Sequence, residues 1–190
     1  MQYIKSCELS LSFFGFEVSS SYQVHRHGYL LALSHSLQGL LSAGYSCDKE
    51  LLQQAISLPW KLRAESEKLK VSGGELTRLA LSAFIRSLSS VPVKLGIDEI
   101  EKWQERLLAF ACDDTAAVRS VAASAASIFF PAYFNENLAN IEATVKGLTL
   151  KITNARKENE RIGACSLVAC LPSQFVGEES LAALCDVIRK

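Results

Sequence analysis

Four arginines have the spacing that best indicates a repeated chemical role. Each stands in the first turns of an expected helix: Arg26, Arg78, Arg119 and Arg161. The last three recur about every 40 residues, and a loop at 72–74 lengthens the first interval. A guanidinium group can pair with a carboxylate or a helix-end carbonyl of a neighbouring unit and so fix the packing of repeats. It can also contact a partner or a transferring phosphate. We favour the packing role, because a repeat by itself explains these positions.

Other polar residues indicate little chemistry. The sequence has no phosphate-binding loop, no Gly-x-Ser-x-Gly and no dinucleotide fingerprint. His25, His27 and His35 lack partners at metal-ligand spacing. Asp113 and Asp114 are interpreted as helix N-terminal charges rather than an acid–base pair, and Asp114 joins the four arginines as a candidate for repeat packing or partner contact. We expect no catalytic residue, no metal, no cofactor and no enzymatic activity.

Composition places the chain among globular proteins. It has 190 residues, of which 49% are hydrophobic and 21% charged, and its formal net charge is zero. This balance argues against nucleic acid and anionic membranes as partners, and no apolar run is long enough to span a bilayer. The six cysteines form no Cys-x-x-Cys pair, so we interpret them as buried thiols of a reducing, cytoplasmic compartment.

Apolar residues at helical spacing predict an all-α fold. Residues 1–24 are poorly defined, and residues 25–190 are expected to form the repeats. Gly44 should end the first helix and Asp48 should cap the second. The expected helices cover His25–Ala43, Asp48 to about Pro59, Glu75–Leu88, Ile97–Leu108, Asp113–Phe130, Asn135–Leu148, Glu158–Leu171 and Glu178–Arg189.

The helix that begins near Asp113 is the clearest repeat element. An acidic N-cap should open it, and Pro131 should stop it after Phe130. Its inward face is expected to consist of small and apolar residues that allow close helix contact: Val118, Ala122, Ala125 and Phe129.

Two kinds of residue, arginine and proline, recur along the sequence with the same period. Besides the arginines, Pro92, Pro131 and Pro172 follow three helices and also recur about every 40 residues. Such a period with two helices per unit predicts a HEAT or armadillo-like α-solenoid of stacked antiparallel helix pairs. The last helix lacks a second helix to complete its unit, so we expect a truncated array with an apolar patch. The residues expected to form that patch are Leu181, Leu184, Val187 and Ile188, with a second patch near Phe13, Phe14 and Phe16.

Several sequence blocks occur in the order typical of one family. The segments 26–32, 73–80, 118–134 and 160–167, with Leu171-Pro172, resemble the C-terminal region of the tubulin-folding cofactor D family. The resemblance starts near Val24 and excludes most of residues 1–24. Family members are large helical-repeat chaperones, and this chain is much shorter than they are.

The resemblance implies a chaperone segment that binds β-tubulin after release from the chaperonin. Implied partners are other tubulin-folding cofactors and an ADP-ribosylation-factor-like small GTPase. The implied processes are αβ-tubulin dimer assembly and microtubule organisation, with the cofactor complex stimulating GTP hydrolysis by tubulin. Association with microtubules is an implied location besides the cytoplasm.

Two alternatives remain open at this point. A generic HEAT-repeat scaffold or adaptor, unrelated to tubulin, would have the same pattern. The second alternative is that one arginine inserts into a partner's active site and accelerates GTP hydrolysis. The sequence singles out none of the four arginines for this role.

Overall fold

The computed structural model describes residues 20–61, 74–134 and 138–189. Within these ranges the chain forms eight α-helices, one 3-10 helix and no strand, so the predicted all-α class is confirmed. The helices are α2 (Ser20–Ser42), α3 (Lys49–Lys61), α5 (Gly74–Ser89), α6 (Ile97–Ala111), α7 (Ala116–Tyr133), α8 (Leu138–Asn154), α9 (Glu158–Val168), η1 (Ser173–Phe175) and α10 (Glu178–Ile188).

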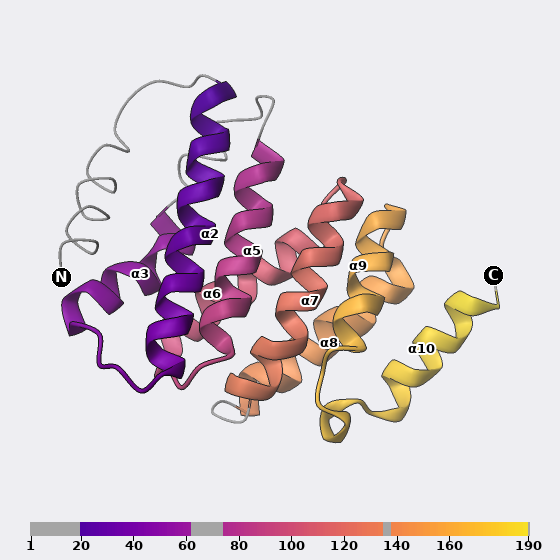
Figure 1. Cartoon of the computed structure of the whole chain (residues 1–190). Helices are drawn as coiled ribbons and strands as arrows, with labels where there is room; N and C mark the ends of the chain where they lie inside the picture. Colours follow the sequence, from indigo (N-terminus) through magenta and orange to yellow (C-terminus); the bar gives the residue numbers. More distant parts are fainter. Residues whose placement is uncertain (1–19, 62–73, 135–137, 190) are drawn as a thin grey trace.

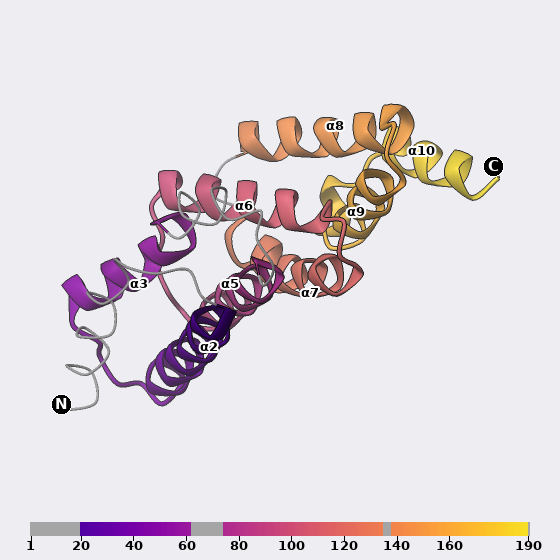
Figure 2. The ribbon, with the colours of Figure 1, turned by 90° about the horizontal axis from the view of Figure 1, so that it is seen from above.

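The described helices alternate between two layers. Seen from above, α2, α5 and α7 form one row, while α3, α6 and α8 form the second (Figure 2). Helix α5 packs between α2 and α7, and α9 extends the first row by its contact with α7. In the second layer α10 packs on α8, and α6 touches both α7 and α9. The N-terminal ends of α2, α5, α7 and α9 therefore lie along one edge, at the top of Figure 1.

Two predicted helix signals have the expected geometry. Gly44 follows α2 with φ of 78°, and its N–H donates to the Leu41 carbonyl at 3.1 Å. Tyr45 donates to the Leu40 carbonyl at 3.0 Å, which completes a Schellman motif. At the start of α3, the Asp48 carboxylate accepts the N–H groups of Glu50 and Leu51 at 3.0 and 3.1 Å. Both the predicted stop and the predicted cap are confirmed.

Several predicted helix ends were wrong. Pro131 lies inside α7, which continues to Tyr133. The ring removes one backbone donor, but the N–H of Phe134 still bonds the Phe130 carbonyl at 2.8 Å, and both aromatic side chains are buried. Burial of this last turn therefore outweighs the helix-breaking tendency of proline. Helix α2 begins at Ser20 rather than His25, and α9 ends at Val168, before the predicted Leu171.

The small-residue face of α7 lies in the core as predicted. Val118, Ala122, Ala125 and Phe129 are all fully buried. Helix α7 packs on α5 in the first layer and on α6 in the second. Ala122 and Ala125 leave no side-chain bulk beyond Cβ, so a neighbouring helix can approach closely.

Replacing Ala122 by leucine is expected to lower the free energy of unfolding by about 1–3 kcal/mol, because the site has no room for a larger side chain. Ala117→Leu, at an exposed position of the same helix, is the matched control and should change stability by less than about 0.5 kcal/mol. Urea unfolding of both variants measures the difference. Equal effects at the two positions would contradict this packing.

One residue of the expected C-terminal apolar patch, Leu181 of helix α10, is exposed as predicted. Ser180 and Ala183 are buried, whereas Leu181 is 52% exposed. Ser180 shares a hydrogen bond of 2.8 Å with Thr149 of α8, which fixes the buried side. Leu184 is partly buried, and nothing is described for the side chains at 187 and 188 or for the predicted patch at residues 13–16. In the part of the chain that the structure describes, no helix combines the length and apolar character needed to cross a membrane.

Candidate functional site

The candidate site is the polar edge, defined here by the N-terminal ends of α5, α7 and α9 with the loops that precede α7 and α9. Arg78, Arg119 and Arg161 lie in the first turns of these three helices. The α6–α7 loop (residues 112–115) precedes α7, and the α8–α9 loop (residues 155–157) precedes α9. These three arginines, which recur about every 40 residues in the sequence, therefore lie near the same end of three helices of the first layer (Figure 1).

Arg78 connects α5 to the α6–α7 loop. Its Nε lies 2.8 Å from Oδ2 of Asp113, and its Nη2 donates to Oδ1 at 3.5 Å. The side chains of Arg78 and Asp113 are 28% and 15% exposed, so water screens this ion pair only in part. Asp113 also accepts the N–H of Thr115 at 2.9 Å. Thr115, not an aspartate, is the N-cap residue of α7, and no side chain caps the helix, so the predicted acidic N-cap was wrong.

Arg119 and Asn159 bind the same loop from two other helices. Nη1 of Arg119 donates to the carbonyl oxygens of Asp113 and Asp114 at 2.8 and 2.9 Å. Nδ2 of Asn159, in α9, donates to the Cys112 carbonyl at 2.8 Å and to Oδ1 of Asp114 at 2.9 Å. The α6–α7 loop therefore joins α5, α7 and α9. These contacts support a packing role for Arg78, Arg119 and Asp114.

The remaining two arginines differ from this pattern. Arg26 is 2% exposed within α2, and the next residue, His27, shares a 2.8 Å hydrogen bond between its Nδ1 and the Leu76 carbonyl of α5. Arg161 is partly buried, as predicted, yet it forms no hydrogen bond or ion pair through its side chain with any described residue. The expected bond from Arg161 to a neighbouring acid or carbonyl is therefore not found.

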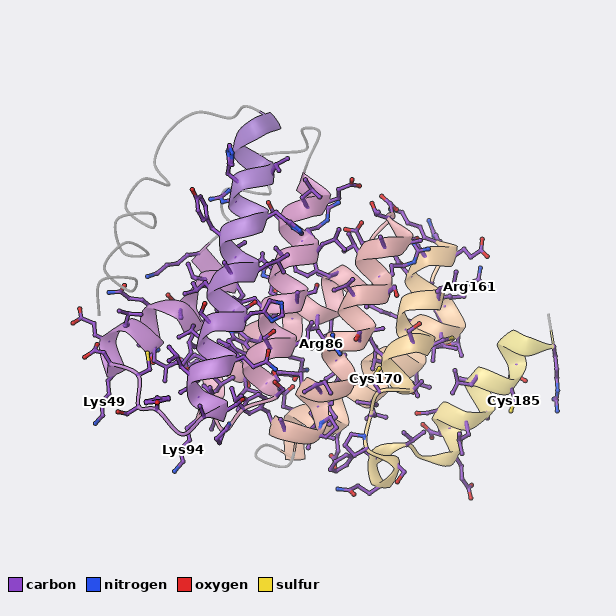
Figure 3. The ribbon with its side chains drawn as sticks, viewed as in Figure 1. Lys49, Arg86, Lys94, Arg161, Cys170 and Cys185 are labelled. Carbon is purple, nitrogen blue, oxygen red and sulfur yellow. The ribbon has the colours of Figure 1, made fainter. Side chains whose placement is uncertain are left out.

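The ion pair at the edge gives a testable coupling. In a double-mutant cycle of Arg78→Ala and Asp113→Ala, we expect a coupling free energy of about 0.5–1 kcal/mol, as for partly exposed pairs. Arg86→Ala, at an exposed position near the C-terminal end of α5, should change stability by less than about 0.5 kcal/mol (Figure 3). Additive single effects would show that the pair contributes nothing to stability.

Sequence reasoning missed the polar contacts between the second-layer helices. Gln104 of α6 is 5% exposed and donates to Oγ1 of Thr144 at 2.5 Å and to Oδ1 of Asn140 at 3.3 Å. Asn140 returns a hydrogen bond to Oε1 of Gln104 at 3.3 Å. The sequence did contain one signal for these contacts, because Gln104 is a polar residue within the apolar stripe of α6. Asn159 gave no signal, since Ala117 stands two residues before Arg119 where Asn159 stands two residues before Arg161.

Four of the five described thiols are poorly suited to nucleophilic chemistry. Burial raises the pKa of Cys47, Cys165 and Cys170. Burial also raises the pKa of Cys112, which nearby Lys151 lowers in part. These thiols stay protonated near neutral pH, and a protonated thiol is a weak nucleophile and metal ligand. No cluster of three or more histidine, cysteine or acidic side chains suited to a metal ion occurs within the described ranges.

Comparison with known proteins assigns the chain to no family, because no family model and no solved structure match it.

Proposed function

We propose that the chain is a segment of a HEAT-like α-solenoid that works as a protein-interaction surface. The polar edge is the observation that carries this proposal. Arginines that recur about every 40 residues occupy equivalent places on α5, α7 and α9, as expected for stacked two-helix units. Alternation of successive helices between two layers also supports it (Figure 2).

We further propose that the partner is β-tubulin. The sequence blocks that resemble the tubulin-folding cofactor D family fall on α2, α5, α7 and α9, which belong to one layer. On this proposal the segment acts in the cytoplasm and at microtubules, together with other tubulin-folding cofactors and an ADP-ribosylation-factor-like GTPase. It takes part in assembling the αβ-tubulin dimer, and it lacks an active site of its own.

The proposed mechanism is differential binding. A protein that binds one conformation or assembly state of tubulin more tightly than another shifts the equilibrium toward the state it prefers. Stimulated GTP hydrolysis by tubulin would then be a property of the whole cofactor complex. The segment would contribute contact surface rather than a reacting group.

A pull-down with purified components tests the partner. The immobilised chain should retain β-tubulin, and companion cofactors should increase the amount retained. Ala122→Leu, which is expected to loosen the packing of the layers, should retain less, whereas Ala117→Leu should retain as much as the unmodified chain. No retention of β-tubulin by the folded chain, with or without the cofactors, would refute the tubulin proposal.

A generic HEAT-repeat adaptor is the second candidate. It is favoured by one observation: Arg78 and Arg119 are engaged in contacts inside the chain, so they select no particular partner. Binding of a different protein in place of β-tubulin would support this candidate. Single-turnover GTP hydrolysis with each Arg→Ala variant tests the remaining hypothesis of an inserted arginine.

A further inference from the structure

The α8–α9 loop corresponds in the repeat to the α6–α7 loop, with its charge reversed. Aligning Arg161 with Arg119 places Ala155 and Arg156 where the first loop has two aspartates, Asp113 and Asp114. Lys157 takes the place of Thr115. One loop presents two carboxylates to its neighbours, and the other presents two cations.

Arg161 also lacks the contacts that Arg119 has. Arg119 bonds two carbonyl groups of its own loop, whereas the side chain of Arg161 has no hydrogen bond or ion pair within the described chain. Nε of Arg161 is nevertheless buried. Burying a guanidinium nitrogen without a partner is costly. The residue as a whole is only partly buried, so an incoming carboxylate would bind the accessible part of the side chain and offset this cost. Figure 3 shows Arg161 at the upper end of α9.

Further cations surround this end of the polar edge. Arg156 and Lys157 are exposed, and exposed Lys151 in the last turn of α8 lies near enough to act on the Cys112 thiol. Two acids, Glu158 and Glu160, stand in the first turn of α9, and neither pairs with Arg161 among the described residues. A third carboxylate, that of Asp114, lies here as well, bonded to Asn159. Four cations against three carboxylates leave a local excess of one positive charge on a chain of zero net charge.

We propose that the basic end of the polar edge, defined as Lys151, Arg156, Lys157 and Arg161, binds an acidic segment of a partner protein. A carboxylate from that segment would take the role that Asp113 has toward Arg78. Guanidinium groups bind carboxylates through paired, charge-assisted hydrogen bonds.

A peptide is favoured over nucleic acid for two reasons. The chain as a whole lacks the basic excess typical of nucleic-acid binding. In addition, Ile162 is 44% exposed directly beside Arg161 and offers an apolar contact to a peptide. The inference rests on the proposed function, in that it treats the chain as a protein-binding module.

Fluorescence anisotropy with a labelled polyglutamate peptide tests the site. We expect saturable binding that weakens as salt is raised, because the attraction is between charges. Arg156→Glu with Lys157→Glu should weaken binding by about tenfold or more, since the reversed charges repel the peptide. The control is Lys49→Glu with Lys94→Glu, which makes the same charge change at exposed positions away from α9 (Figure 3) and should leave the affinity unchanged.

The other possible results either overturn the acidic-peptide proposal or separate it from the tubulin proposal. Equal losses in the two double variants, no binding by the unmodified chain, or tighter binding of a DNA oligonucleotide or of anionic vesicles would overturn the proposal. Arg161→Ala should weaken peptide binding while leaving the circular dichroism spectrum unchanged. Peptide binding without capture of β-tubulin would refute the tubulin proposal alone. Capture of β-tubulin by a chain that fails to bind the peptide would refute this site alone.

Discussion

Replacing Trp103 by alanine is expected to lower the free energy of unfolding by about 3–5 kcal/mol, the range for large buried aromatic side chains. Trp103 is 1% exposed, and its indole N–H donates to the Ile56 carbonyl of α3 at 3.0 Å. Its ring centroid lies 6.5 Å from that of Phe129 in α7. One side chain of α6 therefore joins both layers, so its removal leaves a cavity and breaks a buried hydrogen bond.

Trp60 provides the matched control in the same chain. It is 40% exposed, and its main described contacts are with the cations of Lys102 and Arg106, at 5.3 and 5.6 Å from the ring centroid. Cation–π contacts contribute about 0.5–1 kcal/mol at exposed sites and about 2 kcal/mol where the cation is buried, as Arg106 is, so Trp60→Ala should still have a smaller effect than Trp103→Ala. Denaturant unfolding followed by circular dichroism measures both variants. Similar losses at Trp60 and Trp103 would contradict the placement of the core.

Gly163→Ala is expected to destabilise the chain by about 1–3 kcal/mol or more, because the added methyl group meets backbone rather than a movable side chain. A Cβ at this position of α9 would overlap the Ala111 carbonyl and lie 2.6 Å from its carbon and 3.0 Å from the Cys112 nitrogen. Helix α9 approaches the end of α6 this closely only because residue 163 has no side chain. Relief of the overlap requires α9 to move, which would also strain the contacts of Asn159.

Gly147→Ala is the control for the Gly163 variant. Gly147 also lies inside a helix, α8, but a Cβ there would have no atom within 4 Å. Alanine is a better helix former than glycine, so this variant should be more stable by about 0.5–1 kcal/mol. The two substitutions are chemically identical and should move the thermal midpoint in opposite directions. A rise at both positions would show that α9 is not held against α6 in this way.

Local signals in the sequence were sufficient to predict most helices. Gly44 and Asp48 act through their own backbone neighbourhood, so their effects could be predicted without knowledge of the rest of the fold. The inward face of α7 was also predictable, because the spacing of Val118 and Ala122 is set by helix geometry. Pro131 was misjudged because burial of Tyr133 and Phe134, a tertiary effect, keeps the last turn helical.

The contacts of the polar edge were only partly predictable. The period of the arginines indicated that they share a place in the fold, but it could not show which carboxylate each would meet. Arg78 reaches Asp113 in the α6–α7 loop, whereas Arg161 follows the α8–α9 loop, which carries two cations in place of two carboxylates. Likewise, Gly163 has the same local pattern as any helical glycine, and only the approach of α6 makes it irreplaceable.

The affinity of the chain for β-tubulin in two states tests the central claim most directly. Fluorescence titration of the labelled chain with free β-tubulin and with the assembled αβ dimer gives both dissociation constants. Differential binding predicts that the two constants differ by about tenfold or more, since a smaller preference hardly shifts the equilibrium. Equal affinities for the two states, or binding to neither, would contradict the proposal that this helical segment acts as a tubulin-folding cofactor.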